Sequence, residues 1–300
     1  MLIPDFVSRH VDTTDGTIFV AHGGEGAPVL LLHGFPETHL MWRHIGPRLA
    51  ASFSVVCADL PGYGRSSCPP SDAEHAPYSK RAMANHLVKM MSVLGHEQFS
   101  VVGHDRGGRV AYRMAMDHPE AISKLAVLDI IPTGALWDRA DARLTVGFWP
   151  FSLLAQPAWL PERLIGACPE AVLEDALSNW GSSPEVFPPE LRAAYLDALS
   201  DPTHIHAICE EYRAAATIDR LHDEADASAG RRIGVPLLAM WSESGALNSW
   251  YQEEGGPLEI WRALASDVRG GPFPGGHFFP EEQPTRTAEV LREFLTGGFR

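Results

Sequence analysis

The segment Gly103-His104-Asp105-Arg106-Gly107 constrains the fold of this chain more than any other. An apolar run from Phe99 to Val102 precedes it, and apolar residues at helical spacing follow it between Val110 and Ala115. A sharp strand-to-helix turn strains the backbone of its central residue and tolerates only small neighbours. The pattern therefore predicts a strand, a tight turn that presents Asp105, and a helix.

The residue at the centre of this turn decides which chemistry is possible. In the Gly-x-nucleophile-x-Gly pattern a serine would acylate on esters and amides. A carboxylate such as Asp105 instead attacks an sp³ carbon, displaces a leaving group and forms an ester of the enzyme, which water must then cleave. Haloalkanes, haloacids and epoxides suit this reaction, and a serine-type esterase is disfavoured. The alternatives are an aspartate that only caps a glycine-rich turn, and a binding protein without catalysis.

Alternation of strands and helices indicates the fold class, α/β with a mostly parallel, doubly wound sheet. A hairpin is expected over residues 8–24 and helices near 79–95 and 283–296. The expected strands are 28–32, 53–58, 99–102, 125–129, 235–241 and 267–273. Residues 132–230 are rich in Trp, Pro and helix-period apolar residues. We therefore predict a core domain of 1–131 and 231–300 with an inserted helical lid, 132–230.

Composition limits the partners and the compartment. The net charge of −14 argues against binding to nucleic acid or to an anionic membrane. No apolar run is long enough to span a bilayer, and the N-terminus does not resemble a signal peptide. The four cysteines are scattered without metal-site spacing. We expect a cytoplasmic protein with reduced thiols, no metal and no cofactor, which acts with water on a small molecule.

A nucleophile on such a turn needs a histidine and an acid, which follow it along the chain. His277 lies in a glycine-flanked loop near the C-terminus and is the candidate general base that activates water. The acid that orients it is Asp129 or Glu243, since each follows an expected strand. We favour Asp129, because it directly ends its strand at the carboxyl edge of the sheet.

Two backbone amides are candidates for an oxyanion hole. The segment His33-Gly34-Phe35-Pro36 follows the first buried strand, and Arg106 follows the nucleophile. The N–H groups of Phe35 and Arg106 are expected to donate, whereas Pro36 has no N–H. His33 and His104 are expected to bond nearby backbone.

Arg106 and Arg109 lie three residues apart and share a helix face. Two guanidinium groups beside a nucleophilic carboxylate could bind a substrate carboxylate. They would also create local positive potential in an acidic protein. The alternative is that they pair with carboxylates of the lid.

Aromatic residues of the lid are candidates for binding the leaving group. The phenol O–H of Tyr212 and the indole N–H of Trp149 can donate to a departing halide or an opening epoxide oxygen. The alternative is that these side chains only fill the lid core.

The sequence resembles the haloacetate dehalogenases of the α/β-hydrolase fold, the family of fluoroacetate dehalogenase, over nearly its whole length. The matching segments are His33-Gly34-Phe35-Pro36, Asp59-Leu60-Pro61-Gly62-Tyr63-Gly64, Gly103 to Arg109, Leu128-Asp129-Ile130, Leu154-Ala155-Gln156-Pro157, Glu211-Tyr212-Arg213 and Gly276-His277-Phe278. The resemblance implies that Asp105, Asp129 and His277 form the catalytic triad. It implies that Arg106 and Arg109 hold a substrate carboxylate, that Tyr212 helps to bind the halide, and that the protein is a homodimer.

One segment departs from the family pattern. Pro150 and Phe151 occupy the positions of a His-Trp pair that binds fluoride. Neither side chain can donate a hydrogen bond, and both are smaller, so we expect poor cleavage of C–F bonds and extra room near the halide. The resemblance extends to epoxide hydrolases, which open the ring with two lid tyrosines. Tyr212 fits one of these, and Tyr195 is available as the second.

Overall fold

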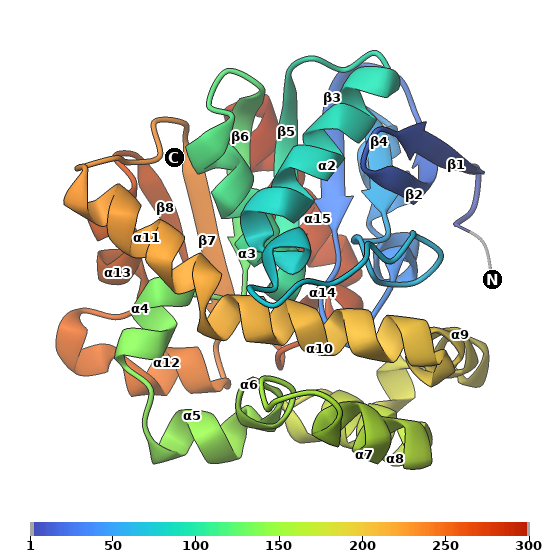
Figure 1. The fold of residues 1–300 in the computed structure, drawn as a ribbon. Coiled ribbons are helices and arrows are strands. Elements are labelled where there is room, and N and C mark those ends of the chain that lie inside the picture. The colour runs from blue at the N-terminus through green and yellow to red at the C-terminus, as the bar shows by residue number, and fades with distance from the viewer. Residues whose placement is uncertain (1–2, 299–300) are drawn as a thin grey trace.

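A single sheet forms the centre of the computed structural model, which describes residues 3–298 (Figure 1). Its strands are β1 (Val7–Thr13), β2 (Gly16–Gly23), β3 (Ala27–Leu32), β4 (Phe53–Ala58), β5 (Phe99–His104), β6 (Ile122–Leu128), β7 (Leu237–Ser242) and β8 (Val268–Phe273). They lie in the order β1-β2-β4-β3-β5-β6-β7-β8. The strands predicted from apolar runs are therefore present, with ends that differ by a few residues.

The sheet is antiparallel only at its N-terminal edge. β1 and β2 form a hairpin in which Thr13 pairs with Gly16, and β2 runs antiparallel to β4. All other neighbouring pairs are parallel. In β3, Val29 to Leu32 are fully buried, as expected for a strand covered on both faces. These features confirm the predicted α/β class with a mostly parallel sheet.

Helices from the core part of the chain cover both faces of the sheet. In Figure 1, α2 (Lys80–Val93) and α3 (Asp105–Asp117) lie in front, and α15 (Pro284–Thr296) lies behind. The other elements of this part are η1 (His39–Arg43), α1 (Gly46–Ala50), η2 (Ala76–Tyr78), α12 (Ala246–Trp250), η4 (Gln252–Glu254), α13 (Pro257–Leu264) and α14 (Phe279–Glu282).

Between β6 and β7 the chain forms a helical insertion, with no strand among the residues that the structure describes there. It comprises α4 (Thr133–Asp138), α5 (Ala142–Gly147), α6 (Trp149–Leu153), α7 (Leu160–Ala167), α8 (Pro169–Asn179), η3 (Pro184–Val186), α9 (Pro189–Ser200), α10 (Pro202–Ala216) and α11 (Ile218–Ser228). In Figure 1, α10 crosses one end of the sheet, and α5 to α8 lie beyond it. The division into a core and a lid domain at residues 132–230 stays a prediction.

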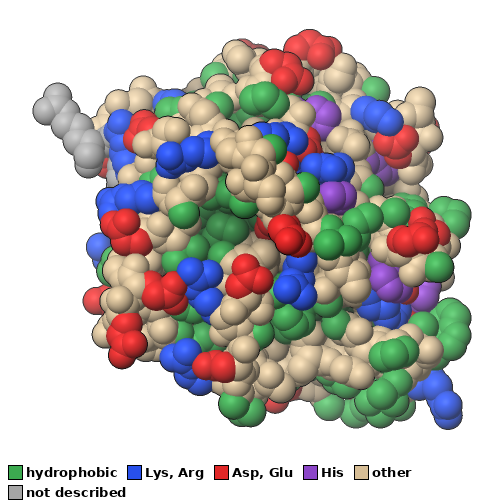
Figure 2. Space-filling model, turned by 60° about the vertical axis from the view of Figure 1, so that its left-hand side comes forward, with side chains coloured by type: hydrophobic (Ala, Val, Ile, Leu, Met, Phe, Trp, Pro, Cys, Tyr) green, Lys and Arg blue, Asp and Glu red, His purple; other side chains and the backbone are tan. Residues whose placement is uncertain are grey.

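The surface carries charges of both signs. Figure 2 shows Lys and Arg side chains interspersed with Asp and Glu over one face, so neither sign dominates that view. None of the described helices combines the length and the apolar character needed to cross a membrane. All four cysteines are free, and Cys57 and Cys209 are buried.

The carboxyl ends of neighbouring parallel strands bring the predicted site together. β5 ends at His104 and α3 begins at Asp105, while β6 ends one residue before Asp129. Because β5 and β6 are adjacent and parallel, both carboxylates lie at the same edge of the sheet. The insertion, which also leaves the sheet after β6, covers this edge.

Candidate active site

Asp105 occupies a strained turn, as the sequence predicts. Its φ angle is +42°, in the left-handed region that a non-glycine residue rarely adopts. A Cβ atom at Gly103 would clash with the backbone of Gly107, and one at Gly34 would lie 2.6 Å from the Cβ of Asp105. The turn therefore requires glycine at both places. This close packing fixes the direction of the Asp105 carboxylate.

His277 is paired with Asp129. Its Nδ1 atom lies 2.5 Å from Oδ2 of Asp129, and both side chains are buried. The other carboxylate oxygen, Oδ1, accepts the backbone N–H of Ser242 at 2.8 Å. The alternative acid, Glu243, is exposed to solvent. The geometry thus favours Asp129 over Glu243 as the partner of His277, and Nε2 of His277 is not used in this contact.

The loop after β3 directs a backbone amide at the nucleophile. The N–H of Phe35 donates to Oδ2 of Asp105 at 3.0 Å. Arg106 is in the first turn of α3, where backbone N–H groups have no acceptor within the helix. Both amides are therefore at positions from which they could stabilise negative charge on an oxygen of Asp105.

The two histidines that flank the site bond backbone, as expected. His33 Nε2 accepts the N–H of Leu60 at 3.0 Å, and its Nδ1 contacts the carbonyl of Gly34 at 2.9 Å. His104 Nε2 lies 2.9 Å from the carbonyl oxygen of His277. These bonds tie the loop after β3, the nucleophile turn and the histidine loop to one another.

Electrostatics favour the ionised form of Asp105. Burial alone would raise the pKa of its carboxyl group. The charges of His277 and Arg106, with smaller effects from His104 and Arg109, outweigh burial and lower this pKa below its ordinary value. The residue is thus held as a carboxylate, which is the nucleophilic form.

The two predicted arginines have different partners. The guanidinium of Arg106 is fully buried and forms a bidentate ion pair with Glu211 of α10, with Nη2 2.6 Å from Oε1. The Arg109 guanidinium donates through Nη1 to the carbonyl of Ile131 and to Oγ1 of Thr133, each at 3.2 Å. For Arg106 the expected alternative, pairing with a lid carboxylate, is thus present. Arg109 forms no ion pair with a described residue, so it is a buried cation with neutral partners.

Each of these guanidinium groups keeps one buried nitrogen without a hydrogen-bond partner in the described part of the chain. These nitrogens are Nη1 of Arg106 and Nε of Arg109. A buried donor without a partner costs free energy, about 1–3 kcal/mol. Each nitrogen could therefore bond an acceptor that a ligand brings. Arg109 lines the cavity over the nucleophile, whereas Arg106 does not line it but contacts the rings of Tyr212 and Phe151, which do.

A small cavity lies over the nucleophile. Its volume is about 30 Å³, and a single water needs roughly 10–15 Å³ by the same measure. The lining residues are Asp105, Arg109, Asp129, Ile130, Leu136, Phe148, Pro150, Phe151, Trp180, Tyr212, Leu247 and His277. Pro150 and Phe151 both line this cavity, and the expectation of extra room beside them stays a prediction.

Of the two expected leaving-group donors, only Tyr212 lines the cavity. The role expected for Trp149 is not supported, because its indole N–H donates to Oδ2 of Asp175 at 2.6 Å. Tyr195 is also directed elsewhere, since its hydroxyl donates to Oε1 of Glu281 at 3.3 Å. The structure therefore brings one lid tyrosine to the cavity.

A buried pair of acidic residues beside the site was missed in the sequence. Glu37 follows the loop that carries Phe35, and its Oε2 atom lies 3.1 Å from Nδ1 of His104. Burial raises the pKa of Glu37 to about 7. Burial and the neighbouring Glu37 also raise the pKa of Glu281, which forms an ion pair with Arg43. Isolated carboxylates in a sequence give no sign of such pairing, which depends on how the loops fold together.

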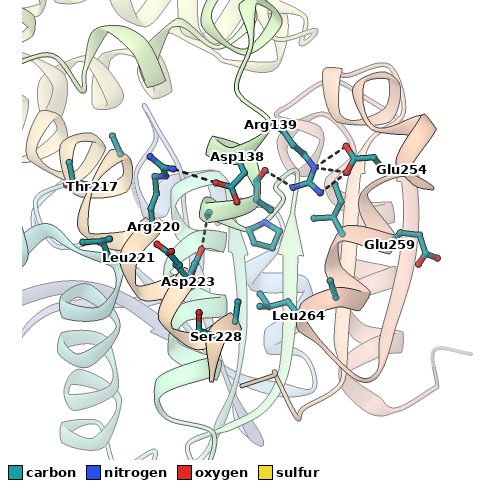
Figure 3. A pocket seen from close by; sticks show the side chains of 18 residues that line it. Asp138, Arg139, Thr217, Arg220, Leu221, Asp223, Ser228, Glu254, Glu259 and Leu264 are labelled. Atoms are coloured by element: carbon teal, nitrogen blue, oxygen red, sulfur yellow. Dashed lines mark hydrogen bonds and ion pairs between the residues drawn. The ribbon is translucent and has the colours of Figure 1, made fainter. Parts of the chain in front are cut away.

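A much wider cavity, of about 820 Å³, lies at the root of the insertion between α4, α11 and α13 (Figure 3). Ion pairs between Arg139 and Glu254 and between Arg220 and Asp138 border it. None of the predicted catalytic residues lines it, so its size does not make it the active site. Among the described residues, no cluster of His, Cys, Asp and Glu forms a candidate metal site.

Comparisons with known proteins agree with this geometry. The family model for the alpha/beta hydrolase fold matches residues 27–172. Fluoroacetate dehalogenase from Burkholderia sp is 43% identical over 97% of this chain and 94% of its own length. A soluble epoxide hydrolase from Corynebacterium sp. (strain C12) is 32% identical over 91% of each chain. A crystal structure described as an alpha/beta hydrolase, from Nostoc sp PCC 7120, has a TM-score of 0.95 at 47% identity and covers 98% of this chain and 99% of that one.

Proposed function

This chain belongs to the α/β-hydrolase family, with fluoroacetate dehalogenase and epoxide hydrolases as relatives, and we propose that it hydrolyses the carbon–halogen bond of small 2-haloacids such as haloacetate. The observation that carries this proposal is the buried Arg109 guanidinium in the cavity of Asp105, which has only neutral partners. The charge of Asp105 acts on this cation, but no carboxylate of a described residue forms an ion pair with it. A buried cation without a bonded anion is costly, and a substrate carboxylate would supply that anion.

In the first step, the carboxylate of Asp105 attacks the carbon that bears the halogen. A carbon–oxygen bond forms, the carbon–halogen bond breaks, and the halide leaves with the bonding electron pair. The hydroxyl of Tyr212 is the proposed donor to the halide, since this residue lines the cavity. The product of this step is an ester between Asp105 and the 2-hydroxy acid.

In the second step, Nε2 of His277 takes a proton from water, and the resulting hydroxide adds to the ester carbonyl carbon of Asp105. The N–H groups of Phe35 and Arg106 are the proposed donors to the oxyanion. Asp129 stabilises the imidazolium of His277. Collapse of the tetrahedral intermediate releases the 2-hydroxy acid and restores the Asp105 carboxylate, and the proton on His277 passes to solvent.

Two observations favour a haloacid over an epoxide. The cavity holds a guanidinium that a neutral epoxide would leave without a bonded anion. Tyr195, the second tyrosine available for ring opening, bonds Glu281 instead. The small volume of the cavity also favours a substrate with few heavy atoms.

The test is product formation by the purified protein with fluoro-, chloro- and bromoacetate and with a styrene-oxide-type epoxide. We expect halide and glycolate from chloroacetate and bromoacetate, and no diol from the epoxide. Diol formation without halide release would contradict the proposal and assign the protein to the epoxide hydrolases.

A further inference from the structure

A chain of four buried charges of alternating sign extends from the site to the junction between the core and the insertion. It runs from Arg106 through Glu211 and Lys80 to Asp219, and each residue is 3% exposed or less. Arg106 and Lys80 belong to α3 and α2, whereas Glu211 and Asp219 belong to α10 and α11 of the insertion. Burying four charges is costly even when they are paired. The chemistry proposed above uses only Arg106 of the four.

Glu211 fixes the orientation of the Arg106 guanidinium. Its carboxylate accepts bonds from Nε at 2.8 Å and from Nη2 at 2.6 Å, which are two edge nitrogens of the planar group. The ring of Tyr212 stacks on the guanidinium, with the central carbon 3.9 Å from the ring centroid. One edge and one face of Arg106 are therefore occupied. Nη1, the remaining nitrogen, is buried without a hydrogen-bond partner among the described residues.

Other residues in turn hold Glu211. Lys80 Nζ forms an ion pair with Oε1 of Glu211 and bonds Oδ2 of Asp219 at 3.2 Å. The hydroxyl of Tyr63 donates to Oε2 of Glu211 at 3.3 Å. These cations lower the pKa of Glu211 although burial opposes this, so the residue stays ionised. Glu211 thus contacts two cations and a phenol and cannot turn without breaking several of these bonds.

We propose that Glu211 is a positioning residue that aims Nη1 of Arg106 at the carboxylate of the substrate. This inference rests on the proposed function for the identity of that anion. Because Glu211 belongs to α10 and Arg106 to α3, correct alignment of the arginine requires the insertion to be docked on the core. Binding of the substrate carboxylate and docking of the insertion are therefore coupled through one ion pair.

A binding measurement with glycolate tests this proposal independently of turnover. Isothermal titration calorimetry would compare the unaltered protein with Glu211→Gln, which keeps the shape of the side chain and removes its charge. We expect glycolate to bind about tenfold more weakly to Glu211→Gln, since a charge-assisted alignment of Arg106 is lost. Where bromoacetate is turned over, its KM should rise more than its kcat falls. Unchanged glycolate affinity would overturn the proposal.

Glu210→Gln is the matched control. Glu210 is the preceding residue on α10, is also buried, and pairs with Arg213 and His75 instead of Arg106. The same substitution there should leave glycolate affinity within about twofold of the unaltered protein. An equal loss in both variants would show that Glu211 only stabilises the packing of α10.

A double-mutant cycle distinguishes positioning from a direct role of Glu211. If Glu211 acts through Arg106, Glu211→Gln should have no further effect on glycolate affinity in an Arg106→Met background. In Arg106→Met, Lys80 still pairs with Glu211, so the substitution does not leave a buried carboxylate without a cation. The melting temperature of each variant would show whether it is folded. A full additional loss in that background would overturn the positioning role. Absence of halide release from the unaltered protein would contradict only the proposed function.

Discussion

The Nδ1 atom of His277 lies 2.5 Å from Oδ2 of Asp129, although 148 positions separate the two residues in the chain. This bond fixes the ring so that Nε2 faces the site, and the N–H of Ser242 holds the other oxygen of Asp129. The carboxylate is thus bound on both oxygens. In the proposed mechanism it would stabilise an imidazolium without moving, which would reduce the reorganisation in the water-activating step.

Substitution of Asp129 should show whether Asp129 or Glu243 is the acid that supports His277. In Asp129→Asn the side chain can still accept the Ser242 N–H, but it no longer stabilises a cationic His277 or selects its tautomer. We expect kcat for halide release to fall by about 10²- to 10⁴-fold with little loss of folded protein. Glu243→Gln is the control, and kinetics with bromoacetate would compare the two. A larger loss in Glu243→Gln than in Asp129→Asn would reverse the assignment.

Variants of Asp105 and of His277 should block different steps of the proposed reaction. Asp105→Ala removes the nucleophile, so no turnover and no adduct are expected. His277→Ala should still be alkylated by bromoacetate but should not hydrolyse the ester, because no base activates water. Intact-protein mass spectrometry would then detect a carboxymethyl adduct that accumulates only in the His277 variant. Multiple turnover by Asp105→Ala would rule out this mechanism.

Arg109 should select for an anionic substrate. Replacing it with Leu removes the cation in the cavity, and kcat/KM for bromoacetate should fall by about 10²-fold, which corresponds to roughly 3 kcal/mol. The loss should appear chiefly in KM. The neutral analogue bromoacetamide provides the control, since any turnover of it should be little affected. Equal losses with both substrates would indicate that Arg109 supports the fold through Ile131 and Thr133.

Fluoroacetate should be a poorer substrate than chloroacetate. Pro150 and Phe151 line the cavity without a donor, and the Trp149 indole is occupied by Asp175. Loss of one charge-assisted bond to the departing halide slows that step by about 10- to 100-fold, and fluoride depends most on such donation. Halide release at matched concentrations would measure this ratio. Trp149→Phe should not change it, and faster release of fluoride than of chloride would refute the prediction.

Glu37 should make stability depend on pH in a defined window. Burial raises its pKa to about 7 from an unfolded value of 4.5, so the folded state binds more protons than the unfolded state between these values. The contribution of Glu37 to the free energy of unfolding is therefore complete below pH 4.5 and is lost as the pH rises through 7. Buried histidines have the opposite effect. Burial lowers the pKa of His33 from 6.5 to about 4, so its contribution to stability rises with pH between these values.

The difference in free energy of unfolding between the unaltered protein and Glu37→Gln isolates the effect of Glu37. Urea unfolding of the unaltered protein and of Glu37→Gln between pH 5 and 8 would give both stability curves. The unaltered protein should lose stability relative to the variant as the pH rises. A constant difference across this range would show that Glu37 does not titrate there.

Several features followed from the sequence because they depend on neighbouring residues. Gly103, Asp105 and Gly107 predict the turn, since its steric demands act over a few positions. Apolar runs such as Val29 to Leu32 predict buried parallel strands, and these predict that Asp105 and Asp129 share one edge of the sheet. The fold class and the order of the candidate triad were therefore readable without a structure.

Other features were decided by the tertiary structure, because they depend on which side chains face one another across the fold. Asp129 and Glu243 both follow strands, and only the position of the His277 loop selects between them. The pairing of Arg106 with Glu211 and of Trp149 with Asp175 depends on how α10 and α8 pack. A hydrogen bond requires an approach of about 3 Å in a definite direction, and residue identity alone cannot specify that direction between distant segments. The sequence thus determined which groups could react, and packing of the insertion on the core decided which donors remain available to a ligand.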